Sequence, residues 1–256
     1  MQVNDRFDGV RRIYTSSSYS ILEKSHIAIV GLGGIGTWVC ESLCRSGIGE
    51  ITLVDLDEIC ISNTNRQIHA HDGNYGKLKI EAMKERILSI NPDCKVNLVE
   101  DFFGEENIEE FFKVSFDYVV DCIDSVKSKC ILINECKKRD IKIITTGGAG
   151  GKCNPQHVTI KDLNKTNNDK LLHVVRTNLK KFYGFKRGPS VYGIPCVFSP
   201  EFKTEPEKTA PTRGLNCQTG YGSLSFVTGT FGFLAAGYVI NDLLKKETIA
   251  EFKNKE

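Results

Sequence analysis

Residues 26–36 read HIAIVGLGGIG, a short and mainly apolar run followed at once by glycines at positions 31, 33, 34 and 36. The run predicts a buried strand over His26–Val30, and helical periodicity predicts a helix over Thr37–Arg45. Glycines between a strand and a helix permit a tight turn and let the backbone approach phosphate oxygens, which the amino terminus of the helix attracts. This stretch therefore predicts a nucleotide-binding turn in a fold that alternates strands with helices.

The alternation continues along the first part of the chain. Further strands are expected over Ile51–Asp55, Lys95–Val99, Asp117–Cys122 and Ile141–Thr145, and further helices over Lys79–Ile90 and Ser125–Arg139. Strands that alternate with helices of this length form parallel sheets. We therefore expect an α/β, Rossmann-like fold with helices on both faces of a mostly parallel sheet. Residues 161–211 are polar and show no assignable pattern.

Charge is distributed unevenly, although the formal net charge is only +2. Residues 1–150 hold 18 basic and 23 acidic residues, whereas residues 151–256 hold 16 basic and 9 acidic ones. A hydrophobic content of 40% excludes a mainly disordered chain. Because no flexible linker is visible, we expect one domain over residues 1–256. Its nucleotide-binding half would span residues 1–150, and residues 151–256 would form a basic C-terminal extension of the same domain.

Cysteine usage and hydropathy bear on the compartment. Ten cysteines occur without a secretory signal in the polar amino-terminal segment, which predicts free thiols in the cytoplasm. They form no C-x-x-C pair, which argues against a structural zinc site.

Residues 223–240 are mostly apolar and approach the length of a membrane span. Their glycines and hydroxyl groups favour a closely packed core or interface helix, so we expect no stable membrane insertion, and membrane association is the lesser alternative.

Polar segments follow the predicted strands. Asp55 and Asp57 end the second strand, residues 62–67 (SNTNRQ) come next, and residues 121–125 (DCIDS) close the fourth strand. The carboxyl ends of parallel strands meet at one crevice, where Lys79 can join these residues. Cations suit a triphosphate and a carboxylate suits Mg²⁺, whereas a nicotinamide needs apolar surroundings. The combination favours ATP chemistry over an NAD-dependent oxidoreductase, although each residue alone could be solvated or cap a helix.

The order of these motifs resembles the ubiquitin-activating-enzyme-like superfamily, which includes ThiF and MoeB and adenylates carboxylates with ATP and Mg²⁺. The resemblance rests on GLGGIG, VDLD, SNTNRQ, YGKLKIEA and DCIDS, and it covers residues 6–151. Residues 63–70 (NTNRQIHA), 145–151 (TTGGAGG) and 196–199 (CVFS) are similar to one branch, the tRNA threonylcarbamoyladenosine dehydratases. With this branch the resemblance extends to residue 240 and is weakest over residues 164–211.

The resemblance implies roles for individual residues. Asn63 and Arg66 would contact the triphosphate, Asp55 would bind the ribose, and Asp124 would hold Mg²⁺. Arg66, Lys79, Asp124 and an N-terminal arginine would act in catalysis; Arg12 is the candidate for that arginine, which would reach into the partner subunit, and Arg6 and Arg11 are alternatives. The full nucleotide site would comprise Gly31, Gly33, Gly34, Gly36, Asp55, Asp57, Asn63, Arg66, Lys79, Asp124 and Ser125.

The resemblance also implies a reaction, the ATP-driven dehydration of threonylcarbamoyladenosine beside the tRNA anticodon. The threonyl carboxylate attacks the α-phosphate of ATP, pyrophosphate leaves, and the carbamoyl group then closes a ring on the acyl-adenylate with release of AMP. Because the second nucleophile belongs to the substrate, no protein nucleophile is required. ATP, Mg²⁺ and a monovalent cation are the implied cofactors, and tRNA and a second copy of the chain are the implied partners.

The alternative is an adenylating activator of a ubiquitin-like or sulfur-carrier protein. In such an enzyme Cys196 would form a thioester or accept sulfur from a cysteine-desulfurase partner. Nothing near Cys196 in sequence favours a reactive thiolate, so a buried packing role is expected. For His69 and His71, an acid/base role and a surface role both stay open.

The densest positive charge lies between residues 152 and 187, where nine cations face two acidic residues. Cations neutralise phosphates, and aromatic rings stack on unpaired bases. Lys170 and Arg176 belong to this stretch, and Phe182, Tyr183 and Phe185 lie among the cations. A solvated basic helix is the alternative to a nucleic-acid surface. We expect contacts with tRNA from Lys180, Lys181, Lys186 and Arg187.

Overall fold

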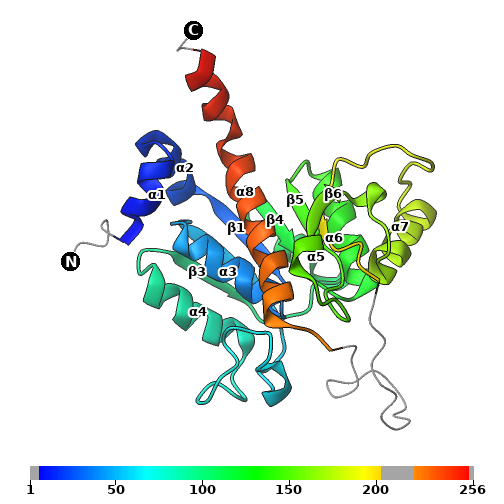
Figure 1. Ribbon diagram of the computed structural model, residues 1–256, viewed down its shortest axis with the longest axis horizontal. Coiled ribbons are helices and arrows are strands. Elements are labelled where there is room, and N and C mark those ends of the chain that lie inside the picture. The colour runs from blue at the N-terminus through cyan, green and yellow to red at the C-terminus, as the bar shows by residue number, and fades with distance from the viewer. Residues whose placement is uncertain (1–5, 203–221, 254–256) are drawn as a thin grey trace.

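The computed structural model describes residues 6–202 and 222–253 of the chain (Figure 1). Its helices are α1 (Asp8–Ile13), α2 (Ser16–Lys24), α3 (Gly36–Arg45), α4 (Lys79–Ile90), α5 (Ile108–Phe111), α6 (Val126–Lys138), α7 (Lys170–Phe182) and α8 (Ser225–Lys253). Its strands are β1 (His26–Val30), β2 (Glu50–Val54), β3 (Lys95–Val99), β4 (Tyr118–Asp121), β5 (Ile143–Thr146), β6 (Thr159–Asp162) and β7 (Pro195–Phe198). Short 3-10 turns lie at Ile61–Asn63, Glu105–Asn107, Pro155–His157 and Leu163–Lys165.

The strands form one sheet in the order β3-β2-β1-β4-β5-β7-β6. Neighbouring strands are parallel except β6 and β7, which are antiparallel. The chain builds outward from β1 to β3 and then returns to the other side of β1 with β4. Val30 therefore lies opposite both Val54 and Asp121, and the carboxyl ends of three strands meet at one edge. Open α/β sheets bind ligands where the strand order reverses, which here is between β1 and β4.

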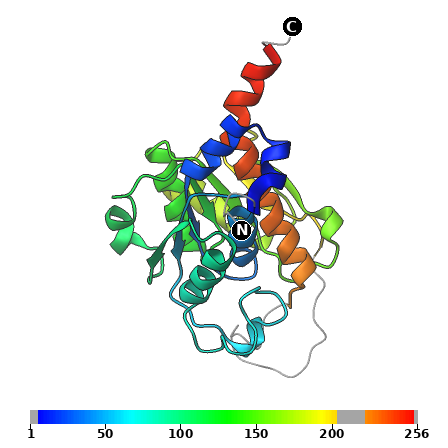
Figure 2. The same cartoon turned by 90° about the vertical axis from the view of Figure 1, so that its left-hand side faces the viewer.

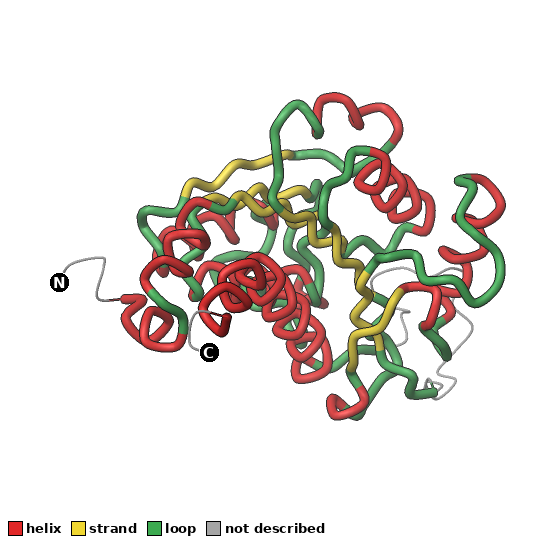
Figure 3. The backbone as a smooth tube through the Cα atoms, turned by 90° about the horizontal axis from the view of Figure 1, so that it is seen from above, coloured by secondary structure: helices red, strands yellow, loops and turns green. Residues whose placement is uncertain are grey.

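Alternate residues of β1 face opposite layers of helices. Ile27 and Ile29 belong to the core shared with α3, α4 and α8, whereas Ala28 and Val30 belong to the core shared with α6 and α7. Both faces of the strand are apolar because helices cover both, as is usual for parallel strands. Figure 3 shows the strands between the two layers, and Figure 2 shows α8 running close to the N-terminal helices, where it packs against α2.

The expected α/β architecture is confirmed. The strands at His26–Val30 and Lys95–Val99 and the helix at Lys79–Ile90 have the expected bounds, and the other strands and helices predicted before residue 147 differ by one or two residues at an end. The apolar helix expected over residues 223–240 begins two residues later and continues to Lys253. The helices α1, α2 and α5 and the strands β6 and β7 were not expected, and a helix in the region of α7 was considered only as the solvated basic helix, without bounds. The two strands have four residues each, too short to show a periodicity.

Helix α8 contains the apolar stretch that raised the question of a membrane. Over Ser225–Leu244 it is long and apolar enough to cross a bilayer, but Val227, Phe231 and Ala235 lie in the core against the sheet and α3. A Cβ added at Gly232 would lie 2.6 Å from Trp38 Cβ and 3.0 Å from the main-chain oxygen of Ile35. The absence of a side chain at Gly232 therefore lets α8 approach α3, in agreement with the expected closely packed helix.

We predict that Gly232→Ala lowers the free energy of unfolding by about 1–3 kcal/mol, because the new methyl group forces α8 away from Trp38. Gly237→Ala is the matched control on the same helix, since a Cβ there meets nothing within 4 Å. Its effect should be neutral or stabilising by up to about 1 kcal/mol, because alanine favours helix over glycine. Urea denaturation of the two variants measures the difference, and equal effects would contradict the close packing.

Candidate functional site

The glycine turn between β1 and α3 is closed by backbone contacts that leave no room for a side chain at two of its glycines. Gly31 has a φ of 93°, and a Cβ at Gly31 would lie 2.9 Å from the main-chain oxygen of Cys122. A Cβ at Gly36 would lie only 1.9 Å from the main-chain oxygen of Gly31. At Gly33, by contrast, a Cβ would meet nothing within 4 Å. Gly31 and Gly36 therefore shape the turn, whereas Gly33 leaves open space at its surface for a phosphate group.

Asp55 follows β2 and binds this turn directly. Its side chain is buried, with Oδ2 accepting a hydrogen bond from the Leu32 N–H at 2.6 Å and Oδ1 accepting one from the Asp57 N–H at 2.9 Å. Burial raises the pKa of the Asp55 carboxyl, and the ammonium of Lys79 opposes that effect. Since each carboxylate oxygen has a second lone pair, Asp55 can still accept a hydrogen bond from a ribose hydroxyl.

Lys79 is the first residue of α4, and its side chain is buried rather than solvated. Its Nζ lies 2.5 Å from Asp57 Oδ2 and 3.8 Å from Asp55 Oδ1. The sequence predicted all three residues for the site but not that they form an ion-paired group. A phosphate contact by Lys79 requires the ammonium to turn from Asp57, whose side chain is more than half exposed, toward the nucleotide.

The loop after β2 brings Arg66 onto the glycine turn. A Cβ at Gly34 would lie 3.3 Å from both Cγ and Cδ of Arg66. The Arg66 guanidinium donates to the main-chain oxygen of Ser62 at 2.7 Å and to Asn65 Oδ1 at 3.0 Å. The main-chain oxygen of Arg66 accepts a hydrogen bond from the indole of Trp38 at 3.0 Å. The structure therefore brings together Arg66 and Gly34, two of the residues expected in the nucleotide site.

Asn63 lies in the same loop and is buried. Its Oδ1 accepts a hydrogen bond from the Cys60 N–H at 3.0 Å, which fixes the 3-10 turn at Ile61–Asn63. In this arrangement Asn63 shapes the loop that carries Arg66. Direct contact between Asn63 and the triphosphate stays a prediction.

A buried ion pair shapes the turn that carries Asp124. The side chains of Asp121 and Lys129 are inaccessible to solvent and 2.8 Å apart, and Thr145 donates to the same carboxylate at 2.6 Å. The other oxygen of Asp121 accepts the Ile123 N–H at 3.1 Å and so bends the chain after β4. Asp124 is exposed at this bend. Lys129 was not among the predicted residues, because its importance depends on burial rather than on a motif.

Ser125 caps a helix in this structure, and its contact with the nucleotide stays a prediction. Its Oγ accepts a hydrogen bond from the Ser128 N–H at 3.5 Å and caps the amino terminus of α6. The alternative in which Asp124 caps this helix is therefore wrong. The Asp124 carboxylate is left at the edge of the sheet, where a ligand can reach it.

The two residues with alternative roles, His69 and Cys196, are both buried. Burial lowers the pKa of His69 to about 4, and neither ring nitrogen has a hydrogen-bond partner among the described residues. A surface position is therefore wrong for His69, whereas His71 is exposed. Cys196 lies on β7 opposite Thr145, and burial raises the pKa of its thiol well above the usual range. This environment fits the packing role expected for Cys196.

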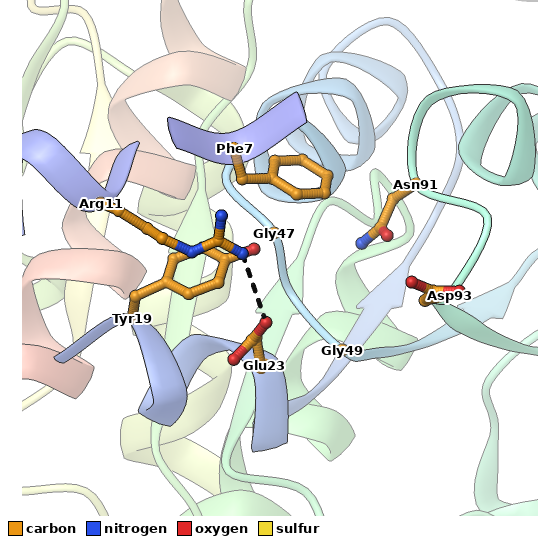
Figure 4. Close-up of a pocket in the computed structure, with 8 residues that line it drawn as sticks. All are labelled: Phe7, Arg11, Tyr19, Glu23, Gly47, Gly49, Asn91 and Asp93. Atoms are coloured by element: carbon orange, nitrogen blue, oxygen red, sulfur yellow. Dashed lines mark ion pairs between the residues drawn. The ribbon is translucent and has the colours of Figure 1, made fainter. Parts of the chain in front are cut away.

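The N-terminal arginines lie near the amino ends of the strands, opposite the glycine turn. Arg6 donates to the main-chain oxygens of Ser89 and Ile90 at 3.1 Å each. Arg11 lines a cavity of about 130 Å³, where its guanidinium lies 3.8 Å from Glu23 (Figure 4). Arg12 is exposed and has no ion pair within the described part of the chain. The structure therefore brings none of the three to the glycine turn of its own subunit.

The basic stretch forms α7, whose buried face consists of Leu172, Val175 and Leu179. The outer face and the following loop expose Lys181, Lys186 and Arg187, and Lys180 is half-buried.

Two members of the wider basic and aromatic stretch make contacts within the protein. Phe185 is buried against Tyr192, with ring centroids 4.9 Å apart, so the expectation that it stacks on bases is wrong. Arg176 is half-buried, and its guanidinium donates to Thr166 Oγ1.

Comparison with known proteins identifies relatives of this chain in both sequence and structure. The sequence matches the ThiF family over residues 10–255. It is 46% identical over 247 residues to the tRNA threonylcarbamoyladenosine dehydratase of Haemophilus influenzae, a match that covers 95% of each chain. The structure superposes with a TM-score of 0.88 on the Escherichia coli tRNA N6-threonylcarbamoyladenosine dehydratase in complex with ATP, at 40% identity and over 95% of this chain and 96% of that one.

A relative of the alternative class matches over a shorter region. The molybdopterin-synthase adenylyltransferase of Haemophilus influenzae is 32% identical over 124 residues, which is 48% of this chain and 51% of the relative. The likeness to the dehydratases thus includes the C-terminal half of the chain, and the likeness to this adenylyltransferase covers only about half of the chain.

We predict that Lys129→Met lowers the free energy of unfolding by about 3–5 kcal/mol, because it leaves the Asp121 carboxylate buried without its partner. Lys127→Met, two residues earlier on α6, is the matched control, since the Lys127 side chain is 70% exposed. Its effect should stay within about 0.5 kcal/mol. Urea denaturation compares the two, and a similar small loss in both variants would show that the buried pair contributes no more than a surface pair.

Proposed function

The chain belongs to the ThiF family, and we propose that it adenylates the threonyl carboxylate of threonylcarbamoyladenosine in tRNA as the first step of a ring closure. It is an ATP-dependent tRNA threonylcarbamoyladenosine dehydratase, since its likeness to these enzymes extends over nearly the whole chain. The observation that carries the proposed chemistry is the contact between Arg66 and Gly34 on the phosphate-binding turn. In this contact the methylene stem of Arg66 lies beside the amino terminus of α3, where a phosphate chain would lie.

The arrangement suits nucleotidyl transfer, in which the enzyme positions the reactants and neutralises charge. Asp55 would hold the ribose while the phosphates lie along residues 31–36. Arg66 would neutralise charge that develops on the phosphates as pyrophosphate leaves, and Lys79 would exchange Asp57 for a phosphate oxygen. The carbamoyl group of the substrate then attacks the activated carbonyl and releases AMP, so no thiol of the protein takes part.

Asp124 is the proposed Mg²⁺ ligand. Magnesium in nucleotide sites is usually held by one or two carboxylates together with substrate phosphates and water. An exposed carboxylate at the β1/β4 reversal fits this pattern, and within residues 6–202 and 222–253 no group of three or more His, Cys, Asp or Glu residues offers a metal cage made by protein alone. When bound, Mg²⁺ would neutralise phosphate charge, while the Asp121–Lys129 pair holds the turn that presents Asp124.

The geometry is compatible with a homodimer in which Arg12 serves the partner's site. Arg6 and Arg11 are engaged within their own subunit, so Arg12 is the best placed of the three to reach across an interface. A monovalent cation and a cysteine-desulfurase or sulfur-acceptor partner stay predictions. The buried Cys196 offers no support for a sulfur relay at that residue.

For tRNA binding we propose the outer face of α7 and the loop that follows it. The helix begins at the edge of the crevice, because its cap Asp169 also accepts the Gly148 N–H at 2.9 Å in the loop after β5. A polymer bound along α7 would therefore pass close to the residues that activate the carboxylate. Its phosphates would pair with the exposed cations at the end of the helix.

We predict that Arg66→Ala lowers kcat/KM for dehydration by about 10²–10³-fold, or about 3–4 kcal/mol, because the cation beside the phosphates is lost. The substitution keeps the main-chain oxygen that binds Trp38, so the emission of that tryptophan should be unchanged. Activity is measured with ATP, Mg²⁺ and modified tRNA by nucleoside mass analysis under mild conditions. Arg139→Ala, which removes a cation bound to Glu109 at 2.6 Å, is the control. Turnover near that of the wild type in Arg66→Ala would remove Arg66 from the site.

We predict that Lys180→Ala/Lys181→Ala/Arg187→Ala weakens tRNA binding without changing the affinity for ATP. The logarithm of tRNA affinity should also fall less steeply with salt concentration, by up to about two units of slope for three contacts to single-stranded phosphates. The control Lys95→Ala/Lys113→Ala/Lys138→Ala removes the same charge at side chains that are 63–68% exposed elsewhere. An unchanged affinity and salt slope in the α7 variant would assign this face to solvent.

A further inference from the structure

Lys152 is a fully buried lysine that the proposed reaction does not use. Its ammonium donates to the main-chain oxygens of three residues, Ser199 at 2.9 Å, Asn168 at 3.3 Å, and Glu201. In the described part of the chain, these three carbonyls give the ammonium acceptors for its N–H donors. We call Lys152 Nζ and these three carbonyl oxygens the carbonyl cage.

The carbonyl cage joins three separate segments of the chain. Lys152 belongs to the loop after β5, Asn168 precedes α7, and Ser199 and Glu201 follow β7. The Asn168 side chain adds a hydrogen bond to the main-chain oxygen of Pro200 at 2.9 Å. The Glu201 carboxylate closes the arrangement by accepting the N–H groups of Cys153 and Asn154 at 3.0 Å each.

A path of alternating peptide bonds and hydrogen bonds leads from the carbonyl cage to the loop that carries Arg66. Gly151, next to Lys152, donates its N–H to the main-chain oxygen of Gly222 at 3.0 Å. The following residue, Ser223, accepts a hydrogen bond from Asn65 Nδ2 at 2.6 Å. Asn65 in turn accepts one from the Arg66 guanidinium at 3.0 Å. Displacement of the loop after β5 would therefore change the position of the Arg66 side chain.

We propose that Lys152 is a positioning residue whose ammonium acts as an internal monovalent cation and keeps Asn65 and Arg66 in place through Gly151, Gly222 and Ser223. This inference rests on the proposed role of Arg66 beside the phosphates. Main-chain carbonyls that surround an ammonium can also coordinate K⁺, because they replace the water shell of either ion. An empty cage should accept an added cation, which gives the proposal a chemical test.

The test compares Lys152→Ala, which opens the cage, with Lys152→Met, which fills it with an uncharged chain. Both variants and the wild-type protein are placed in KCl, methylammonium chloride or choline chloride at equal ionic strength. Three quantities are measured: the melting temperature, the emission of Trp38, and the KM for ATP in tRNA dehydration. Trp38 is the single tryptophan of the chain, and its indole binds the main-chain oxygen of Arg66, so its emission reports on this loop.

In choline, Lys152→Ala should melt at a lower temperature, change its Trp38 emission and raise the KM for ATP by about tenfold, because charged hydrogen bonds are lost. KCl or methylammonium should restore all three quantities toward wild-type values in Lys152→Ala. Lys152→Met should show the same losses, and its response to KCl or methylammonium should be no larger than that of the wild-type protein. The wild-type protein should respond less to the choice of cation than Lys152→Ala does.

Two results would overturn the proposal: wild-type behaviour of Lys152→Ala in choline, or an equal response of Lys152→Ala and Lys152→Met to K⁺. Recovery of the melting temperature without recovery of Trp38 emission or of KM would show a structural cage that does not position Arg66. If a variant is too unstable for the activity assay, the dependence of its melting temperature on K⁺ still tests whether the cage binds a cation. Melting and emission need no substrate, so they test the cage even if the proposed function fails.

Discussion

The close approach of Gly36 to the main-chain oxygen of Gly31 is the constraint on which the rest of the site depends. A Cβ at 1.9 Å from that oxygen cannot be accommodated, so only glycine lets α3 begin directly above the end of β1. Once the turn is closed, its neighbours are determined: Cys122 lies against Gly31, Asp55 binds the Leu32 N–H, and the stem of Arg66 crosses Gly34. Three segments distant in sequence thus meet at one short turn.

Buried charge organises the surroundings of this turn. Asp121 and Lys129 neutralise each other inside the sheet layer, and Lys79 lies between Asp57 and Asp55 at its edge. In a medium of low dielectric constant such groups are stabilised only when partners and geometry are both correct. The pairs therefore fix the positions of the Asp124 turn and of the start of α4. They also position carboxylate and ammonium groups where the proposed ligand, a negatively charged nucleotide with its Mg²⁺ ion, would bind.

The division of labour within the chain follows from the reaction. Because the substrate carries both the carboxylate that is activated and the group that closes the ring, the enzyme supplies position and charge rather than a nucleophile. Burial raises the pKa of seven cysteine thiols, which therefore act as apolar packing groups. They are Cys40, Cys44, Cys94, Cys122, Cys130, Cys136 and Cys196. The C-terminal half contributes β6, β7, α7 and α8, which extend the sheet and cover its faces.

The sequence by itself determined the local features of this protein. Apolar runs and helical periodicity predicted strands β1 to β5 and helices α3, α4 and α6, and the spacing of glycines and acids predicted where a nucleotide would lie, because these signals arise within a few residues of one another. Only the tertiary structure decided the partners of Lys79, the burial of His69 and Phe185, and the carbonyl cage around Lys152. Each of these depends on which distant segments the fold brings together. The sequence around a lysine does not show whether its side chain will be buried or solvated, because burial is decided by those distant segments.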